Sequence, residues 1–175
     1  LLDNSADIFA KTTDDGLTAL HLASQFGNRE IVKLLLNSGA CIDSKTRFGW
    51  TLLHSAAFKN RHGVVLLLLQ FSQHIINVRA ENRGTSLHLA AQVGHKRIVQ
   101  LLVEKGADVR AKTKYGDTPA HLASWYSHSK AIGELLALGM NYDWDTTNDQ
   151  DGCTALHYAA KWGVESIARM LVSDG

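Results

Sequence analysis

Histidine is the residue type in this chain with the strongest claim to chemistry, because nine copies occur in 175 residues. Five of them close a recurring Thr-x-x-His tetrapeptide at intervals of 33, 34, 33 and 36 residues: His21, His54, His88, His121 and His157. Imidazoles serve as general bases and as metal ligands. Metal ligands must converge on one point, whereas a translational repeat spaces equivalent side chains apart. We therefore expect these histidines to be structural, each bonded to its own threonine turn and to the adjacent loop.

A second group of chemistry-bearing residues is acidic and lies late in the chain: Asp143, Asp145, Asp149 and Asp151. Calcium sites of the helix–loop–helix type need alternating oxygen ligands, a central glycine and a distal glutamate. Here Thr146 and Thr147 interrupt the alternation, and no such glutamate follows. We expect a solvated acidic loop, with selection of a basic partner by charge as the alternative.

The two cysteines give no evidence of catalysis or of a disulfide framework. Cys41 and Cys153 lie more than a hundred residues apart in sequence and have no metal-ligand spacing. Nothing near Cys153 in the sequence would lower its pKa. The chain also has no glycine-rich phosphate loop and no nucleophile elbow. We predict that this chain is not an enzyme and uses no metal or cofactor.

Charge and hydropathy bear on location and on the class of partner. The net charge is +1, so the chain lacks the basic footprint of a nucleic-acid binder, and we expect no nucleic-acid partner. The longest apolar run, residues 64–69, is far below the roughly 20 residues that cross a bilayer. No basic, cleavable leader opens the chain. We predict an intracellular, cytoplasmic location without membrane insertion by this segment.

Each histidine tetrapeptide opens a unit with the same pattern of helix signals. A pair of small residues follows the tetrapeptide, and about ten residues past the histidine an apolar i, i+1, i+3, i+4 series indicates a second helix. The threonine is placed to cap the first helix, an effect worth ~1 kcal/mol, and Pro119 falls at a first helical position. The turn between the two helices holds a left-handed residue in each unit, expected at Gly27, Asn60, Gly94, Ser127 and Gly163.

Glycines mark the ends of most second helices. We expect left-handed C-caps at Gly39, Gly106, Gly139 and Gly175. We expect the fourth unit to be the weakest, because Ser127 occupies its turn and Gly133 falls inside its second helix. A glycine inside a helix costs ~1 kcal/mol relative to alanine.

These units resemble the ankyrin repeat, whose pattern is G-x-T-P-L-H-x-A-A-x-x-G-H-x-x-I-V-x-x-L-L-x-x-G-A-D. The resemblance implies an all-α solenoid of stacked helix-turn-helix units with projecting, hairpin-like loops. We place the tail of a preceding repeat at 1–13, repeats at 14–46, 47–80, 81–113 and 114–149, and a truncated last repeat at 150–175. The departures from the pattern are Arg83 at the usual loop glycine, Ser72-Gln73-His74 in place of Gly-Ala-Asp, and extra residues near Ile75-Ile76 and between Tyr142 and Asp149.

Both ends of the sequence fall inside the repeat pattern. Leu1-Leu2 matches the end of a second helix, and Gly175 matches a C-cap. Terminal units of a solenoid normally carry a polar outer face, and neither terminal unit here does. We therefore expect further repeats on both sides of this segment in the parent protein.

The candidate binding residues are those that the repeat does not need for its structure. In ankyrin-like arrays the loops project and the first helices line a concave face. Eight of the thirteen aromatic residues fall in such positions, and exposed aromatic rings are common anchors of protein interfaces. With the basic residues interleaved among them, the predicted partner-binding set is Phe26, Arg47, Phe48, Trp50, Phe58, Lys59, Lys114, Tyr115, Trp125, Tyr126, Lys161 and Trp162. Packing of Phe26 and Phe58 against the next repeat is the structural alternative.

The resemblance implies a protein–protein interaction scaffold that binds a partner protein or peptide through the concave face and loop tips. A second interpretation makes the array the regulatory or targeting region of a larger enzyme, channel or effector. A third, that the segment is itself an enzyme or nucleic-acid binder, would need convergent polar groups or a basic stripe, and the sequence has neither.

Overall fold

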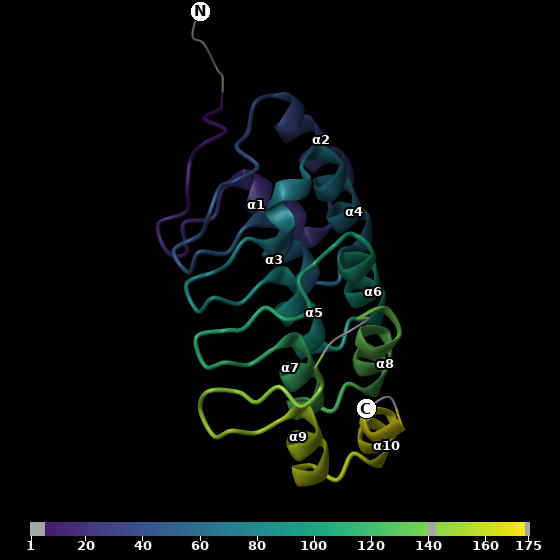
Figure 1. The fold of residues 1–175 in the computed structure, drawn as a ribbon. Coiled ribbons are helices and arrows are strands. Elements are labelled where there is room, and N and C mark those ends of the chain that lie inside the picture. The colour runs from purple at the N-terminus through teal and green to yellow at the C-terminus, as the bar shows by residue number, and fades with distance from the viewer. Residues whose placement is uncertain (1–5, 140–142, 174–175) are drawn as a thin grey trace, which may run out of the picture.

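A computed structural model describes residues 6–139 and 143–173 of the chain. Within these residues the chain forms five pairs of α-helices and one short 3₁₀ helix (Figure 1). The pairs are α1 (Ala19–Phe26) with α2 (Arg29–Asn37), α3 (Leu52–Phe58) with α4 (His62–Phe71), α5 (Ser86–Val93) with α6 (Lys96–Glu104), α7 (Pro119–Trp125) with α8 (Ser129–Leu138), and α9 (Ala155–Lys161) with α10 (Glu165–Ser173); η1 (Gln73–Asn77) follows α4.

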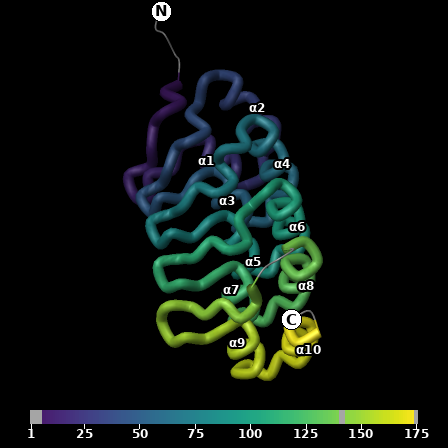
Figure 2. The backbone as a smooth tube through the Cα atoms, in the orientation of Figure 1, coloured from purple at the N-terminus to yellow at the C-terminus, as the bar shows by residue number. Residues whose placement is uncertain are grey.

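The helix pairs stack in chain order to form an open solenoid. The first helices, α1, α3, α5, α7 and α9, pack side by side in one column, and the second helices form a parallel column beside it, on the right in Figure 1. The extended segments between pairs run as successive loops on the side of the first column away from the second helices, as the tube in Figure 2 shows. The predicted all-α repeat architecture with projecting loops is confirmed.

The first helices begin where the threonine positions predict. All five threonines have extended backbone angles and form a capping box: the threonine hydroxyl faces the backbone N–H of the histidine three residues on, and that histidine's side chain returns to the threonine N–H. Pro119 is the first residue of α7. The capping box satisfies backbone donors that a helix start leaves unpaired, so the same four-residue motif sets the start of each repeat.

The predicted left-handed residues in the inter-helix turns are confirmed, including the two that are not glycine. Asn60 and Ser127 have φ values of 59° and 62°. The predicted glycine caps after α2 and α6 are also left-handed, with φ of 91° at Gly39 and 88° at Gly106.

The left-handed cap predicted at Gly139 is wrong, because this residue has φ −81° and ψ 48°. Its N–H donates to the Leu135 carbonyl at 2.7 Å, which continues the helical pattern. The corresponding prediction for Gly175, and the helix match of Leu1-Leu2, lie outside the described residues.

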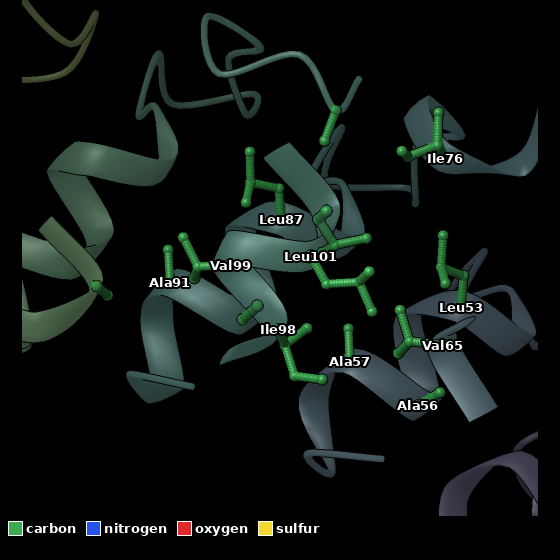
Figure 3. Close-up of a cluster of buried hydrophobic side chains, with 14 of the residues drawn as sticks. Leu53, Ala56, Ala57, Val65, Ile76, Leu87, Ala91, Ile98, Val99 and Leu101 are labelled. Carbon is green, nitrogen blue, oxygen red and sulfur yellow. The ribbon is translucent and has the colours of Figure 1, made fainter. Parts of the chain in front are cut away.

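The core is one continuous cluster that lies between the two helices of each pair and between neighbouring pairs. Figure 3 shows alanines of the first helices, such as Ala57 and Ala91, beside Val65, Ile98 and Val99 of the second helices, and all of these are buried. Alanines allow the first helices to approach closely, and the larger second-helix residues fill the space behind. Burial of one such aliphatic side chain contributes ~1.5–3 kcal/mol, so each repeat depends on the next for its stability.

The departures from the repeat pattern are accommodated locally. Arg83 adopts φ 62° at the loop position where a glycine is usual. The extra residues after α4 form η1, whose Ile75 and Ile76 are buried against the core. The boundaries drawn between repeats stay predictions.

Candidate functional site

The Thr-x-x-His motifs form a continuous polar seam through the stack, which we call the threonine–histidine seam. The Nε2 atoms of His54, His88 and His121 lie 3.2, 3.1 and 3.0 Å from carbonyl oxygens in the loop of the following repeat. His21 makes the same contact with the Trp50 carbonyl at 3.4 Å. The predicted bonds to the local turn and to the adjacent loop are both present, so these histidines couple each repeat to the next.

Burial determines the charge state of the seam. Desolvation lowers the pKa of His54 and His88 to about 4, although hydrogen bonds to loop carbonyls oppose the shift. Desolvation also lowers the pKa of His21 and His121. A neutral imidazole fits the geometry, because Nδ1 accepts from the threonine N–H while Nε2–H donates to the carbonyl. Within the described residues, no group of three histidine, cysteine or acidic side chains is arranged to hold a metal ion.

A second set of inter-repeat bonds comes from the residue at the N-cap of the second helix. The side chains of Arg61, His95 and His128 each donate to a carbonyl near the end of the preceding repeat's first helix, all at 3.0 Å. The sequence analysis missed this set. Its signal was available, since these three residues recur at 34- and 33-residue intervals, but the position carries Asn28 in the first repeat and Val164 in the last.

Five of the eight predicted aromatic residues line two hollows, and the first hollow lies at repeats one and two. Trp50 and Phe58 meet edge to face with their ring centroids 5.4 Å apart. Both are half-buried, whereas Phe48 is 59% exposed. The first hollow has a volume of about 310 Å³ and is lined by Asp15, Leu17, Gln25, Thr46, Phe48, Trp50, Ser55, Phe58 and Lys59.

The second hollow lies at repeats four and five and has a different lining. The Trp125 ring packs edge-on against Tyr158 at 4.9 Å and against Trp162 at 5.5 Å. The hollow has a volume of about 570 Å³ and is lined by Asp117, His121, Leu122, Trp125, Tyr126, Gln150, Asp151 and Tyr158. The sequence analysis missed Tyr158, because it occupies a core-facing helix position whose polar end reaches the loop.

Repeat three separates the two hollows. It carries Gly84 where repeat two has Trp50, and Gln92 where repeats two and four have Phe58 and Trp125. The rings of Trp50, Trp125 and Tyr126 in the predicted binding set therefore fall into two groups, and Tyr115 lies on the loop between α6 and α7.

The structural alternative for Phe26 and Phe58 is that each ring packs against the next repeat, and the exposure of the rings bears on it. Phe26 is 64% exposed and so does not pack into the next repeat. Phe58 is half-buried and packs on Trp50 of its own repeat. Five other predicted binding residues are exposed large hydrophobics: Phe48, Tyr115, Trp125, Tyr126 and Trp162.

Three of the four predicted basic residues contact these rings. The ammonium groups lie 5.3 Å from the Phe58 centroid for Lys59, 4.9 Å from Tyr115 for Lys114, and 5.0 Å from Trp125 for Lys161. These distances are within the range of cation–π attraction. Arg47 instead donates to the Thr13 carbonyl in the preceding loop.

The predicted acidic loop is exposed, and one of its members is tied to the second hollow. Asp151 Oδ1 accepts from the Tyr158 hydroxyl at 3.3 Å and from the Cys153 N–H at 3.2 Å. Desolvation raises the pKa of Asp151, but the hydrogen bonds outweigh it, so the pKa lies below its usual value. Desolvation raises the pKa of Cys153, and the neighbouring Asp151 raises it further. The thiol is thus not activated.

Stacked helix pairs joined by a buried Thr-x-x-His seam define an α-solenoid repeat protein whose exposed surface differs from unit to unit. A family model for ankyrin repeats, in three copies, matches residues 1–81, 65–144 and 87–175. The chain belongs to the ankyrin-repeat family, and ankyrin repeats mediate protein–protein interaction.

Relatives with similar sequences are longer proteins. The chain is 32% identical over 161 residues to the transient receptor potential cation channel subfamily A member 1 homolog of Caenorhabditis elegans, covering 92% of this chain and 13% of the channel. It is 31% identical over 169 residues to ankyrin repeat and SOCS box protein 3 of Bos taurus, covering 95% of this chain and 32% of that protein. It is 31% identical over 136 residues to SH3 and multiple ankyrin repeat domains protein 2 of Homo sapiens, covering 78% of this chain and 7% of that protein. The chain thus spans about a third or less of these relatives.

Proposed function

We propose that this chain binds a partner protein or peptide through the first-helix face and the loop tips, with the aromatic rings as anchors. It acts there as a binding module, without catalysis and without a cofactor, in the cytoplasm. The proposed contact residues are Phe26, Arg47, Phe48, Trp50, Phe58, Lys59, Lys114, Tyr115, Trp125, Tyr126, Lys161 and Trp162.

One observation carries the proposal: the threonines of all five repeats and the seam histidines of the first four are buried, whereas most of these rings are exposed. His54 and His88 have 0% and 1% of their surface exposed, while Phe48 and Tyr126 have 59% and 47%. Exposed aromatic side chains gathered around hollows are typical of interface anchors. The core does not require them, so selection for folding alone does not explain their placement.

The test compares two surface variants in affinity capture from lysate of the source cells, followed by binding measurements with each purified protein that is captured. The ring variant replaces Phe48, Tyr115 and Tyr126 with alanine. These rings are more exposed than Trp50 and Trp125, which make ring contacts that support the fold. The control variant replaces Arg97 and Gln100 on α6 with alanine, on the outer helix column.

We expect the ring variant to bind the purified partner at least tenfold more weakly than the unmodified chain does. The control variant should bind the partner with unchanged affinity. Loss of two or three interface anchors supplies an effect of this size. If the partner bound both variants and the unmodified chain with equal affinity, the aromatic rings would not be part of the binding surface.

A second candidate is that the array regulates or targets a larger protein. The similarity to a stretch covering only 13% of a channel relative and 7% of a multidomain relative favours it. The flanking sequence tests it directly. A membrane-spanning run or a catalytic motif next to the array would support it, and an array flanked only by further repeats would oppose it. No helix in the described ranges is long and apolar enough to cross a membrane.

A further inference from the structure

The second hollow combines flat aromatic walls with carboxylates, and this combination selects a class of ligand. Trp125 and Tyr126 line it and are 36% and 47% exposed, so a visiting group can reach their rings. Tyr158 completes the wall from α9, held edge-on to Trp125. Aromatic faces carry negative electrostatic potential and attract cations.

Two acidic side chains line the same hollow from different repeats. Asp117 Oδ1 accepts from the Asn148 Nδ2 at 3.1 Å, and Asp151 Oδ1 accepts from the Tyr158 hydroxyl. These bonds hold both carboxylates in place, and the Asn148 side chain that links them is itself buried and also donates to the Tyr158 hydroxyl at 2.7 Å. Among the described residues, neither carboxylate forms an ion pair within 4 Å. The hollow therefore presents two fixed carboxylates that form no ion pair within the described part of the chain.

We propose that the second hollow receives an arginine side chain of the partner, with its guanidinium on the Trp125 and Tyr126 rings and its N–H groups directed to Asp117 and Asp151. This inference rests on the proposed function and names the chemistry of one anchor of the partner. A guanidinium fits better than an ammonium because it is planar, stacks on aromatic faces, is weakly hydrated and offers five N–H donors to acceptors in two directions.

One ring of this hollow, that of Trp125, already contacts a cation of the chain. The Lys161 ammonium lies 5.0 Å from the Trp125 centroid and 5.7 Å from that of Trp162. Lys161 is not among the lining residues of the hollow, so the cavity stays available. Its charge opposes an incoming cation, and we expect Lys161→Met to strengthen arginine binding about two- to threefold.

The first hollow is a matched comparison within the same chain. It has aromatic walls of Phe48, Trp50 and Phe58, but its lining includes a cation, Lys59, as well as one carboxylate, Asp15. Its local charge is therefore balanced, and we expect no preference for a cationic side chain there.

The experiment titrates the folded chain with the tripeptide N-acetyl-Ala-Arg-Ala-amide and follows the tryptophan indole N–H signals by NMR. Two further tripeptides replace arginine with citrulline, its uncharged isostere, or with lysine. The expected result is a shift of the Trp125 signal, with the Trp50 signal unmoved. The arginine peptide should bind at least tenfold more tightly than the citrulline peptide and about three- to fivefold more tightly than the lysine peptide.

Substitution of the acids tests the assignment of the site. The double variant Asp117→Asn/Asp151→Asn keeps the hydrogen-bond acceptors for Asn148 and Tyr158, so the fold is retained. Its affinity for the arginine peptide should fall about tenfold or more, as expected for loss of charge-assisted hydrogen bonds. Asp15→Asn at the first hollow is the control and should change the affinity less than twofold. Thermal melting of each variant checks that folding is intact.

Three results would overturn the inference: equal binding of arginine and citrulline peptides, binding of lysine as tight as arginine, or unchanged affinity in the double asparagine variant. In each of these cases the ring variant described above still reports separately on the proposed function, because its readout is the affinity of the natural partner rather than of a basic tripeptide.

Discussion

The threonine–histidine seam and the aromatic surface lie on the same repeats but differ in burial, in charge and in regularity. The threonine–histidine motif is present in all five repeats with the same local hydrogen bonds, and its histidines are buried in the first four repeats. The aromatic rings are mostly exposed, accompanied by lysines and carboxylates, and absent from the corresponding positions of repeat three. The difference indicates that recurring residues hold the stack together while the residues that vary between repeats are available for recognition.

The two hollows extend this comparison to the surface itself. Both have aromatic walls, yet one has Lys59 beside Asp15 and the other has two carboxylates without an ion pair in the described ranges. A repeated fold thus presents two sites of different charge about two repeats apart. The partner that fits both would offer an apolar group to the first hollow and a cationic group to the second.

The largest expected effect is a loss of folding stability when the pH is lowered, because the seam histidines become protonated. His54 and His88 have a pKa of about 4 in the folded chain against 6.5 when unfolded. The unfolded chain therefore binds protons more readily, so the seam's contribution is complete above pH 6.5 and is lost as the pH falls toward 4. The two shifts correspond to a loss of roughly 3 kcal/mol each. Urea unfolding at pH 7.5, 6, 5 and 4 measures it, and a free energy of unfolding independent of pH across this range would contradict the burial of neutral histidines.

The second prediction compares an interior member of the seam with the last one. His88→Ala removes bonds to Thr85 and to the Asp117 carbonyl and leaves a cavity, so it should cost about 3 kcal/mol. His157 is exposed and bonds only to Thr154 within the described residues, so His157→Ala should cost about 1 kcal/mol. Chemical denaturation of the two variants checks the order, and equal losses would mean that the inter-repeat bond adds nothing.

The third prediction concerns the repeat expected to be weakest. A Cβ added at Gly133 in α8 would meet no atom within 4 Å, so Gly133→Ala should stabilise the chain by about 1 kcal/mol. Gly94→Ala is the control: φ there is 75°, and the added Cβ would lie 2.5 Å from His128 Nδ1, so it should destabilise by 1 kcal/mol or more, about the cost of a left-handed residue. Thermal melting distinguishes them, and a stability loss for Gly133→Ala would show that repeat four is not limited by its glycine.

The smallest effect on stability is expected at the exposed rings. Phe26→Ala and Tyr126→Ala should each change the free energy of unfolding by about 0.5 kcal/mol or less, as is usual for surface positions. Trp50→Ala should cost more, because its ring is half-buried against Phe58. Unfolding curves measured in parallel give the comparison. Equal losses of unfolding free energy for Tyr126→Ala and Trp50→Ala would show that the half-buried ring supports the fold no more than the exposed ring does.

The fold could be predicted from the sequence because its determinants are local and recur. Thr118, Pro119 and His121 specify a helix start within four residues, and five copies of the motif leave little ambiguity. The conformation of Gly139 could not be predicted, because glycine adopts both signs of φ readily and its presence alone does not fix the backbone there. The bonds of His95 and His128 were missed although these residues recur with the repeat, because the same position carries Asn28 in the first repeat and Val164 in the last.

The candidate site was predictable as a set of residues but not as a geometry. The repeat frame assigned Trp125, Tyr126 and Trp162 to positions outside the core, and all three are exposed. The division into two hollows depends on repeat three and on the buried link from Asn148 to Tyr158, a contact between residues ten apart that sequence spacing does not reveal.

The most direct test measures affinity and stability on the same sample of the Phe48→Ala/Tyr115→Ala/Tyr126→Ala variant, using a purified partner and urea unfolding. If these rings serve recognition and not folding, the variant should lose at least tenfold in affinity for the partner. Its free energy of unfolding should stay within about 1 kcal/mol of that of the unmodified chain. A stability loss of several kcal/mol together with unchanged affinity would show that these rings belong to the core and would contradict the account.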